Sequence, residues 1–305
     1  MEQWHFIINP VSGKGKGIKI WDSVQRRLDK DNIPYSYSIS KYHGHSIDLV
    51  CEKANAGINN FIGIGGDGTM NEALNGMLKS SYPNKEKMIL GLIPVGTGND
   101  WVKSLPSVLN TANLCDKITS KNVIDHRVGV THVLETGSIR YFLNVAGGGL
   151  DGQVVYELEH QNQNTKKTKW NYLMSALKAL INYRSAEFKI LKDQNAGHIE
   201  KLLFFTASIG KYFGGGMLVS PEADYSGNEL SLTKAGKASL IKVLPQLTKL
   251  FNGQVENISF VKKYSAKKVR LEVGSPIRIQ VDGEYFGESK EIEFSLNKNP
   301  IKILV

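Results

Sequence analysis

The sequence predicts an α/β domain followed by a β-rich domain, and two observations support this prediction. Up to about residue 125, short apolar runs alternate with helical patterns, which indicates a parallel sheet covered by helices on both faces. From Asn122 onward, segments of alternating polar and apolar residues dominate, and glycine-rich turns punctuate them. We therefore expect a second domain built as a sandwich or a distorted barrel.

The N-terminal half repeats a strand-then-helix order. Apolar residues recur at helical spacing in the expected helix Ile18–Leu28, and Ser46 is a suitable N-cap for the next one. A third helix is expected from the glycine-rich turn to Leu78, and a fourth follows the last strand of this half. The expected strands are His5–Ile8, Tyr35–Ile39, Phe61–Ile64 and Ile89–Ile93.

The C-terminal half is expected to be mostly strands. Two helices interrupt it, near Asn171–Ile181 and Ser239–Phe251, and the polar stretch His160–Lys169 is expected to be a mobile loop. The expected strands are Tyr141–Val145, Phe188–Leu191, Leu202–Ile209, Glu229–Thr233, Val269–Val273, Ile277–Val281, Ile292–Phe294 and Ile301–Val305.

Length and composition are typical of a soluble globular protein. The 305 residues suggest two domains, and 41% hydrophobic with 22% charged residues is an ordinary balance. Cys51 and Cys115 have no metal-site spacing, which favours a reducing cytoplasm. The start of the chain has no signal-peptide pattern, and no apolar run could cross a bilayer. A lipid substrate would therefore be reached from outside the membrane.

The net charge of +9 allows three interpretations: an ordinary solvated surface, attraction to anionic lipid headgroups, or nucleic acid binding. No nucleic-acid-binding motif accompanies the charge, so nucleic acid is not expected as a partner. Much of the excess lies beyond residue 160, at Lys166, Lys167, Lys169, Lys178, Arg184, Lys262, Lys263, Lys267, Lys268 and Arg270.

A glycine-rich turn, Gly65-Gly66-Asp67-Gly68-Thr69, follows the third strand and precedes a helix. Without side chains, the backbone N–H groups can approach an anion, and the helix adds the positive end of its dipole. The turn therefore predicts polyphosphate binding. The alternative is a strand-to-helix turn that binds no ligand.

Two further loops of small residues follow other strands, at Asn9–Gly13 and Pro94–Asp100. Ligands of parallel sheets bind beyond the carboxyl ends of the strands, and all three loops are expected at that edge. A nucleotide-using enzyme is the leading hypothesis.

Taken together, these motifs resemble the diacylglycerol kinase catalytic-domain family, in the form of bacterial lipid kinases related to sphingosine and ceramide kinases. The segments that carry the resemblance are Asn9–Gly13, Gly44-His45, Gly65–Gly76, Pro94–Asp100, Phe142–Asp151, Tyr212–Ala223 and Asp282-Gly283-Glu284. The resemblance implies an N-terminal α/β domain like those of phosphofructokinases and NAD kinases, a C-terminal β-sandwich, and an ATP cleft between them. It implies domains at 1–126, joined by the returning segment 288–305, and at 127–287.

The resemblance also implies the ATP contacts. Ser40 stands where the family usually has threonine, and it keeps the hydroxyl. Glu72 has an alternative role as a first-turn acidic residue that favours the helix dipole. The implied contacts are Asn9, Pro10, Val11, Ser12, Gly13, Ser40, Gly66, Asp67, Gly68, Thr69, Met70, Asn71, Glu72 and Thr97.

Three carboxylates match catalytic positions of the family. Asp67 and Asp100 would lie near the phosphates, where a bridging Mg²⁺ would relieve their repulsion from ATP. Asp100 has the alternative role of an N-cap before Trp101. Glu284 matches the general base for the lipid hydroxyl, although Asp282-Gly283 by itself favours a plain hairpin turn.

The implied structural Mg²⁺ site departs from the family pattern. Gly227 stands where the family has a metal-binding aspartate, so either Asp224 or Glu229 supplies the oxygen or the site is lost. Asp125 matches an acidic position in a water-linked metal network. Ile209 replaces the asparagine of an Asn-Gly pair usually found before Tyr212.

The resemblance therefore implies a cytoplasmic, peripherally membrane-associated lipid kinase that uses ATP and Mg²⁺. The expected acceptor is diacylglycerol or a related lipid at the membrane surface, and a homodimer is left open. Two alternatives remain: an NAD kinase-like enzyme, and a nucleotide-binding regulatory protein without turnover. Asp282-Gly283-Glu284 and Tyr212–Met217 favour the lipid kinase over the first, and retention of Asp67, Asp100 and Glu284 argues against the second.

Overall fold

The computed structural model describes residues 3–96, 98–160, 178, 183–192 and 197–305. The chain divides into two compact units. Unit 1 contains residues 1–126 and 299–305, and unit 2 contains residues 127–298.

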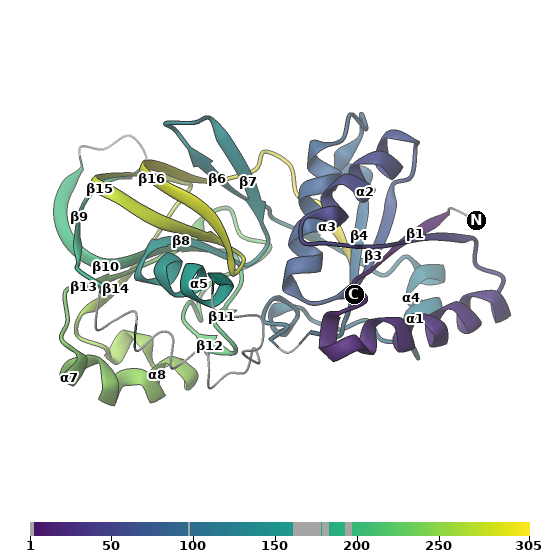
Figure 1. Cartoon of the computed structure of the whole chain (residues 1–305), viewed down its shortest axis with the longest axis horizontal. Coiled ribbons are helices and arrows are strands. Elements are labelled where there is room, and N and C mark those ends of the chain that lie inside the picture. Colours follow the sequence, from purple (N-terminus) through teal and green to yellow (C-terminus); the bar gives the residue numbers. More distant parts are fainter. Residues whose placement is uncertain (1–2, 97, 161–177, 179–182, 193–196) are drawn as a thin grey trace. The chain divides into compact units, whose positions relative to one another are not determined.

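The described part of unit 1 is built on a six-stranded sheet with the order β2-β1-β3-β4-β17-β5 (Figure 1). All neighbouring strands are parallel except β17 and β5. The predicted parallel α/β domain is therefore confirmed, with one antiparallel edge. The strands are β1 (Trp4–Ile8), β2 (Tyr35–Ile39), β3 (Asn60–Gly65), β4 (Ile89–Pro94), β5 (Val123–His126) and β17 (Ile301–Leu304).

Helices cover both faces of this sheet (Figure 1). Apolar residues of α1 and α4, such as Trp21, Leu28 and Leu114, form one core with Phe6 and Ile64 of the strands. Helix α3 packs against α2 and is buried from Thr69 to Met77. The helices are α1 (Ser12–Lys30), α2 (His45–Asn55), α3 (Asp67–Lys79) and α4 (Leu114–Ser120), with short 3₁₀ turns η1 (Lys85–Lys87) and η2 (Trp101–Ser104).

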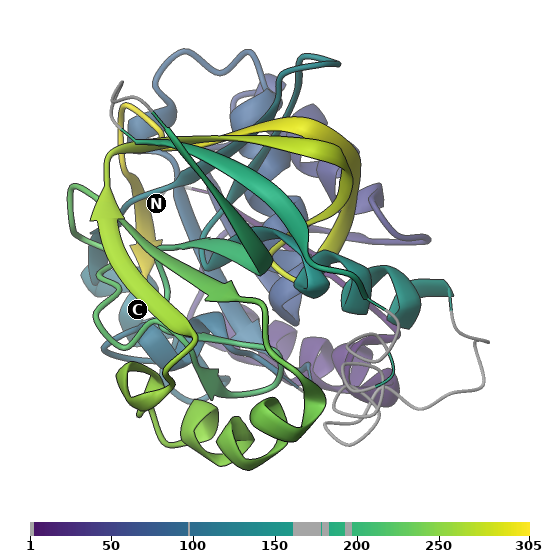
Figure 2. The same cartoon turned by 90° about the vertical axis from the view of Figure 1, so that its left-hand side faces the viewer.

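The described part of unit 2 is a nine-stranded antiparallel sheet, as the β-rich prediction requires. Its long strands β15 and β16 curve strongly (yellow-green and yellow in Figure 2). The strands are β6 (Gly129–Val133), β7 (Ser138–Phe142), β8 (Val145–Gly149), β9 (Ala186–Lys192), β10 (His198–Ser208), β13 (Leu230–Gly236), β14 (Val261–Ala266), β15 (Lys268–Val281) and β16 (Glu284–Leu296), with a separate pair β11 (Tyr212–Phe213) and β12 (Met217–Leu218).

Strands β8 and β9 both lie between β10 and β15, one after the other. β8 pairs with Phe204–Ser208 of β10, and β9 pairs with His198–Leu202 of the same strand. On the other side, both also pair with β15. Between β8 and β9 the chain leaves the sheet and forms helix α5 (Leu150–His160), which packs on β15 (Figure 1).

Glycines let α5 approach the sheet. A Cβ at Gly152 would lie 2.1 Å from the carbonyl oxygen of Arg278, and one at Gly147 would lie 2.4 Å from Oδ2 of Asp151. Real Cβ atoms do not approach other heavy atoms so closely, and the backbone of β15 cannot move aside cheaply. Gly147, before α5, and Gly152, in its first turn, are therefore packing requirements of unit 2.

Several expected elements differ in detail. Val269–Val273 and Ile277–Val281 belong to one strand, β15, with a register shift between its halves. The expected helix Ser239–Phe251 is split into α7 (Leu240–Val243), η3 (Leu244–Gln246) and α8 (Leu247–Phe251), because Pro245 has no N–H to donate. A further 3₁₀ turn, η4, spans Val255–Asn257.

The expected strand Tyr141–Val145 covers the end of β7 and the start of β8. The segment that returns to unit 1 starts at residue 299 instead of the expected 288, because β16 pairs with β15 and β6 through Leu296. The expected helix Asn171–Ile181 lies outside the described residues apart from Lys178, as does the expected loop after His160. No described helix is long and apolar enough to cross a membrane.

Candidate active site

In unit 1, the three glycine-containing loops lie together at the carboxyl edge of neighbouring strands β1, β3 and β4. The backbone N–H of Asn9 donates to the carbonyl of Ile64 (3.0 Å), and that of Val95 donates to Gly65 (2.7 Å). The Asn9 side chain reaches Thr69, with 3.2 Å between Nδ2 and Oγ1. The three loops that the sequence predicts at one edge of the sheet are therefore neighbours in the structure.

The first loop contains three consecutive residues in the left-handed region. Gly13, Lys14 and Gly15 have φ of 58°, 61° and 84°. A Cβ at Gly13 would lie 2.4 Å from the carbonyl oxygen of Val95, whereas one at Gly15 would meet nothing within 4 Å. Gly13 is thus required both by its backbone conformation and by its contact with the loop after β4.

The loops after β3 and β4 touch backbone to backbone. A Cβ at Gly96 would lie 2.8 Å from the Cα of Gly66, and a Cβ at Gly65 would lie 2.1 Å from Oγ1 of Thr69. Gly65 and Gly96 are therefore needed for packing within the protein itself. Gly68 lies in the first turn of α3, and Thr97 lies outside the described residues.

Asp67 links these two loops. Its Oδ2 accepts a hydrogen bond from the backbone N–H of Asp100 (3.0 Å), and its Oδ1 accepts one from Trp101 (3.1 Å). Asp100 is buried, and its carboxylate forms an ion pair with Lys103. The two predicted phosphate-side carboxylates thus lie next to each other, both attached to the start of η2.

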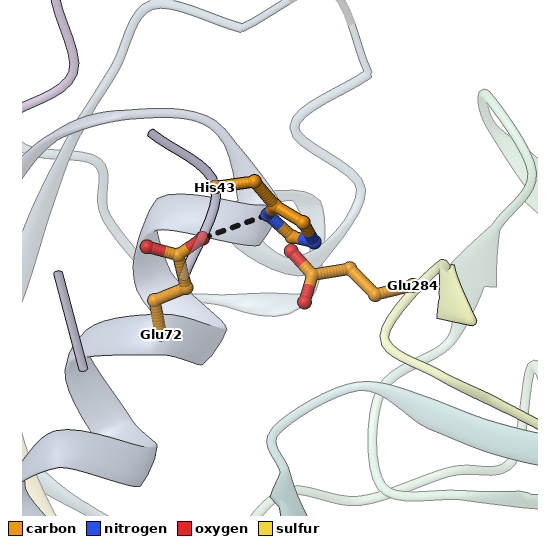
Figure 3. A group of neighbouring side chains, drawn as sticks. All are labelled: His43, Glu72 and Glu284. Carbon is orange, nitrogen blue, oxygen red and sulfur yellow. Dashed lines mark hydrogen bonds and ion pairs between the residues drawn. The ribbon is translucent and has the colours of Figure 1, made fainter. Parts of the chain in front are cut away.

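Glu72 anchors a third segment, the loop before α2. Its carboxylate accepts hydrogen bonds from the backbone N–H groups of Gly44 (2.7 Å) and Ser46 (3.2 Å), and Nδ1 of His43 lies 3.0 Å away (Figure 3). Gly44 has a φ of 88°, so this loop depends on glycine. Glu72 therefore supplies the acceptor that the N-terminus of α2 lacks, a role that the sequence did not reveal.

The remaining predicted ATP contacts lie around the same edge of unit 1. The Ser40 hydroxyl donates to the carbonyl of Ile8 (3.3 Å), directly after β2. Met70 and Asn71 are buried in the first turns of α3, and Val11 is exposed. Pro10 and Ser12 flank Val11 at the start of the first loop.

In unit 2, Asp282 and Gly283 form the turn between β15 and β16, as expected for a hairpin. The Asp282 carboxylate accepts hydrogen bonds from the backbone N–H groups of Leu143 (2.9 Å), Asn144 (2.9 Å) and Val145 (3.0 Å). Asp282 therefore fixes the turn to the start of β8.

Glu284 is the first residue of β16 (labelled in Figure 3), and its carboxylate forms an ion pair with Arg140 of β7. Both side chains are largely buried, with exposed fractions of 12% and 18%. Gly283 is held by the side chain of Gln280, whose Oε1 accepts its backbone N–H at 2.9 Å. The turn that carries Glu284 is thus fixed by three sets of contacts, made by Asp282, by Gln280 and by Arg140.

Sequence reasoning missed Asp151, which lies behind this turn. Its Oδ2 accepts a hydrogen bond from Gln280 (3.2 Å), while its Oδ1 has no hydrogen-bond partner among the described residues. Burial raises the pKa of Asp151 to about 7. The sequence signal was an acidic residue two positions after the Gly147–Gly149 run.

The predicted structural-metal residues have protein partners. Asp224 accepts hydrogen bonds from the backbone N–H and the hydroxyl of Ser226, and Glu229 accepts one from Ser265. In unit 1, Asp125 pairs with Lys302 at 3.1 Å. Within the described part of unit 2, no three acidic, histidine or cysteine ligand atoms come within 4.8 Å of one another.

Several of the late basic residues are neutralised locally. Lys263 pairs with Glu222 (2.8 Å), Lys268 with Glu293 (2.8 Å), and Arg270 with Glu291 (2.8 Å). These ion pairs reduce the surface charge that the sequence alone suggests for β14 and β15.

Two family models match the chain. The diacylglycerol kinase catalytic domain matches residues 3–131, and the YegS C-terminal NAD kinase beta sandwich-like domain matches residues 144–301. The chain belongs to the diacylglycerol kinase catalytic-domain family. A phosphotransferase of the kinase type follows from this membership, with ATP as the implied phosphoryl donor.

Relatives of this family cover almost the whole chain. A diacylglycerol kinase of Bacillus subtilis is 26% identical over 94% of this chain and 91% of its own length. A diacylglycerol kinase of Staphylococcus epidermidis is 28% identical over 92% of this chain and 85% of its own length. This low identity supports a lipid kinase family without fixing the acceptor.

Solved structures share the fold. The crystal structure of a diacylglycerol kinase from Bacillus anthracis matches with a TM-score of 0.70 at 18% identity, covering 99% of this chain and 96% of the other. An NAD kinase from Archaeoglobus fulgidus in complex with ATP matches with a TM-score of 0.56 at 10% identity, covering 99% and 93%. The predicted likeness to the NAD kinase fold is confirmed.

Proposed function

We propose that this chain transfers the γ-phosphoryl group of ATP to the hydroxyl of a lipid, with diacylglycerol as the first acceptor and phosphatidic acid as the product. The observation that supports the acceptor is that curated relatives spanning more than nine-tenths of the chain are diacylglycerol kinases. The observation that supports the donor is the meeting of three glycine-containing loops at the carboxyl edge of β1, β3 and β4.

Phosphoryl transfer needs a positioned donor and compensation of negative charge. Backbone N–H groups at the start of α3 would bind the phosphates. Carboxylate oxygens are suitable Mg²⁺ ligands, and Asp67 and Asp100 lie together in the same loop pair, so these two residues would hold the metal that accompanies ATP. Mg²⁺ would supply charge neutralisation at the phosphates.

The acceptor side needs a base. Glu284 would take the proton of the lipid hydroxyl while that oxygen bonds to the γ-phosphorus and the bond from phosphorus to the leaving ADP oxygen breaks. Arg140 would keep the Glu284 carboxylate in one orientation, because a guanidinium binds a carboxylate with fixed geometry. The predicted ATP contacts around unit 1 belong to the same proposal.

The test is transfer from γ-labelled ATP to a panel of acceptors: diacylglycerol, phosphatidylglycerol, sphingosine and NAD. Labelled phosphatidic acid supports the proposal. Transfer to NAD alone would favour the second candidate, an NAD kinase-like enzyme. The likeness of the fold to the Archaeoglobus fulgidus NAD kinase is the reason for testing this candidate. ATP binding without transfer to any acceptor would indicate a regulatory protein.

We also propose that the chain reaches its lipid by peripheral binding to anionic membranes. The net charge of +9 supports this, although ion pairs such as Lys263–Glu222 and Lys268–Glu293 reduce the positive charge locally on β14 and β15. At physiological ionic strength, screening limits the range of electrostatic attraction from surface charges to about 8 Å. Binding to anionic vesicles should therefore weaken as the salt concentration rises. Equal sedimentation with neutral and anionic vesicles would contradict this part of the proposal.

A further inference from the structure

The loop of residues 222–229 in unit 2 contains the residues that the family resemblance assigns to a structural Mg²⁺. The loop folds on itself: the backbone N–H of Gly227 donates to the carbonyl of Asp224 (3.1 Å), and that of Ser226 donates to the Asp224 carboxylate (2.8 Å). It borders a surface hollow of about 530 Å³ that is lined by Glu222, Asp224 and Glu229. A negatively charged loop of this kind needs a counter-charge.

Lys263 supplies part of that counter-charge by pairing with Glu222 (2.8 Å), and a second cation, Arg127, binds the loop through neutral oxygens. Its Nε donates to the carbonyl of Gly227 at 3.1 Å, and its Nη2 donates to Oδ1 of Asn228. Its backbone N–H also donates to the carbonyl of Tyr225 at 2.7 Å. One half-buried residue therefore binds three oxygens of the loop, two of them through a fixed guanidinium fork.

The same loop is poorly suited to a divalent cation. Mg²⁺ demands near-octahedral oxygen ligands, and Ca²⁺ takes six to eight. Gly227 offers no carboxylate, and its carbonyl already accepts from Arg127. The carboxylates of Asp224 and Glu229 accept hydrogen bonds from Ser226 and Ser265.

We infer that the guanidinium of Arg127 is the resident cation of this loop and replaces the structural metal ion that the family resemblance implies. The covalently held charge of Arg127 then takes the place of a bound ion in a loop where glycine at position 227 offers no carboxylate. The loop is consequently ordered without any divalent cation. This inference does not depend on the proposed function.

The experiment is thermal unfolding of nucleotide-free protein in EDTA and in millimolar Mg²⁺. The parent should melt at the same temperature in both. Arg127→Ala should melt several degrees lower in both, because the carbonyl of Gly227 and Oδ1 of Asn228 lose their charged hydrogen-bond donor. The matched control is Arg270→Ala, an arginine of the same unit whose partners are surface glutamates; its melting temperature should change little.

A second variant keeps the test decisive if Arg127→Ala does not fold. Arg127→Lys retains the charge and loses the fork, and it should melt between the parent and Arg127→Ala. Adding Gly227→Asp to either variant should create Mg²⁺-dependent stabilisation. A Cβ at Gly227 would lie 3.3 Å from the Asp224 carbonyl, so the loop can accept it with a small shift.

Two results would contradict the inference that Arg127 replaces the metal ion. The inference is wrong if Mg²⁺ raises the melting temperature of the parent and Asp224→Asn removes that rise, because the loop would then hold a metal. It is also wrong if Arg127→Ala and Arg127→Lys both melt like the parent.

Discussion

The carboxylate of Asp67 accepts the backbone N–H of Trp101 at 3.1 Å and thereby joins the first turn of α3 to the start of η2. Its other oxygen accepts the N–H of Asp100. A residue that sequence reasoning assigned to the phosphate side is thus also a structural link between two strand-end loops. Any substitution at Asp67 will change both stability and the geometry of the loops.

We expect Asp67→Asn to lower the free energy of unfolding by about 1–3 kcal/mol, because an amide has a single acceptor oxygen for the two N–H groups and lacks the charge. ATP affinity should fall as well, since the loop after β4 loses its attachment. Urea unfolding and nucleotide binding by calorimetry measure the two effects. Asp116→Asn, on the exposed side of α4, is the control and should leave both unchanged.

Glu72→Gln should loosen the loop before α2. The carboxylate holds two backbone N–H groups there, and their loss should cost about 1–2 kcal/mol of unfolding free energy. Hydrogen exchange at Ser46 should accelerate in the variant. Glu52→Gln, also on α2 but exposed, should show neither change. Unaltered exchange at Ser46 would show that Glu72 does not anchor this loop.

Gly13→Ala and Gly15→Ala form a matched pair in the first loop. Both residues have positive φ, so both variants carry the conformational cost of about 1 kcal/mol for a non-glycine residue. Only at Gly13 does the new Cβ also meet the Val95 carbonyl, at 2.4 Å. Gly13→Ala should therefore melt clearly lower than Gly15→Ala and lose more ATP affinity. Equal melting temperatures would mean that the contact with Val95 is easily relieved.

Asp151 should make unit 2 sensitive to pH. Its pKa is raised by burial to about 7, above that of an unfolded aspartate, so the folded state holds a proton between about pH 4 and pH 7 that the unfolded state has released. The unfolding free energy should fall as pH rises through this window, by up to about 1.4 kcal/mol per pH unit, and then stay level. Tyr183 is a neighbouring titratable group, and its pKa is also raised by burial.

The comparison with Asp151→Asn isolates this contribution, because asparagine cannot ionise. The variant should gain stability relative to the parent as pH rises from about 4 to about 7. Urea titrations across this range measure the difference. A constant difference between the two proteins would show that Asp151 is already ionised in the folded state.

The sequence was sufficient for the alternation of strands and helices in unit 1 because each apolar run there is buried on both faces. Phe6, Ile62 and Leu90 are fully buried, and such strands read directly as apolar segments. It was also sufficient for the three loops, because strand ends of a parallel sheet meet at one edge. Asp282-Gly283 could be recognised as a hairpin turn for a different reason, because these two residue types favour a tight turn locally.

The rest depended on contacts between residues far apart in the chain. No local pattern shows that Glu72 accepts the N–H groups of Gly44 and Ser46, or that Arg127 reaches the carbonyl of Gly227 a hundred residues away. The arrangement in which β8 and β9 pair with successive parts of β10 also depends on residues far apart in the chain. The start of the returning segment was placed at 288 and not at 299, because only the pairing of β16 with β6 shows that this strand stays in unit 2 through Leu296.

Glu284 is the position at which the proposed chemistry can be separated from the structure of the turn. Its carboxylate pairs with Arg140, while the turn itself is held by Asp282 and Gln280. Glu284→Gln keeps the size of the side chain and an oxygen that can accept from Arg140, but it cannot take a proton. The fold of the turn should therefore survive the substitution.

We expect Glu284→Gln to reduce kcat by about 10²–10⁴, the usual contribution of a general base, with ATP affinity and melting temperature nearly unchanged. Glu288→Gln is the control on the same strand, because Glu288 pairs with Arg278 at an exposed position, and it should keep the parent rate. Initial-rate kinetics with the lipid acceptor found in the panel assay provide the measurement. Normal turnover by Glu284→Gln would mean that Glu284 is part of the hairpin only and that the proton is accepted elsewhere.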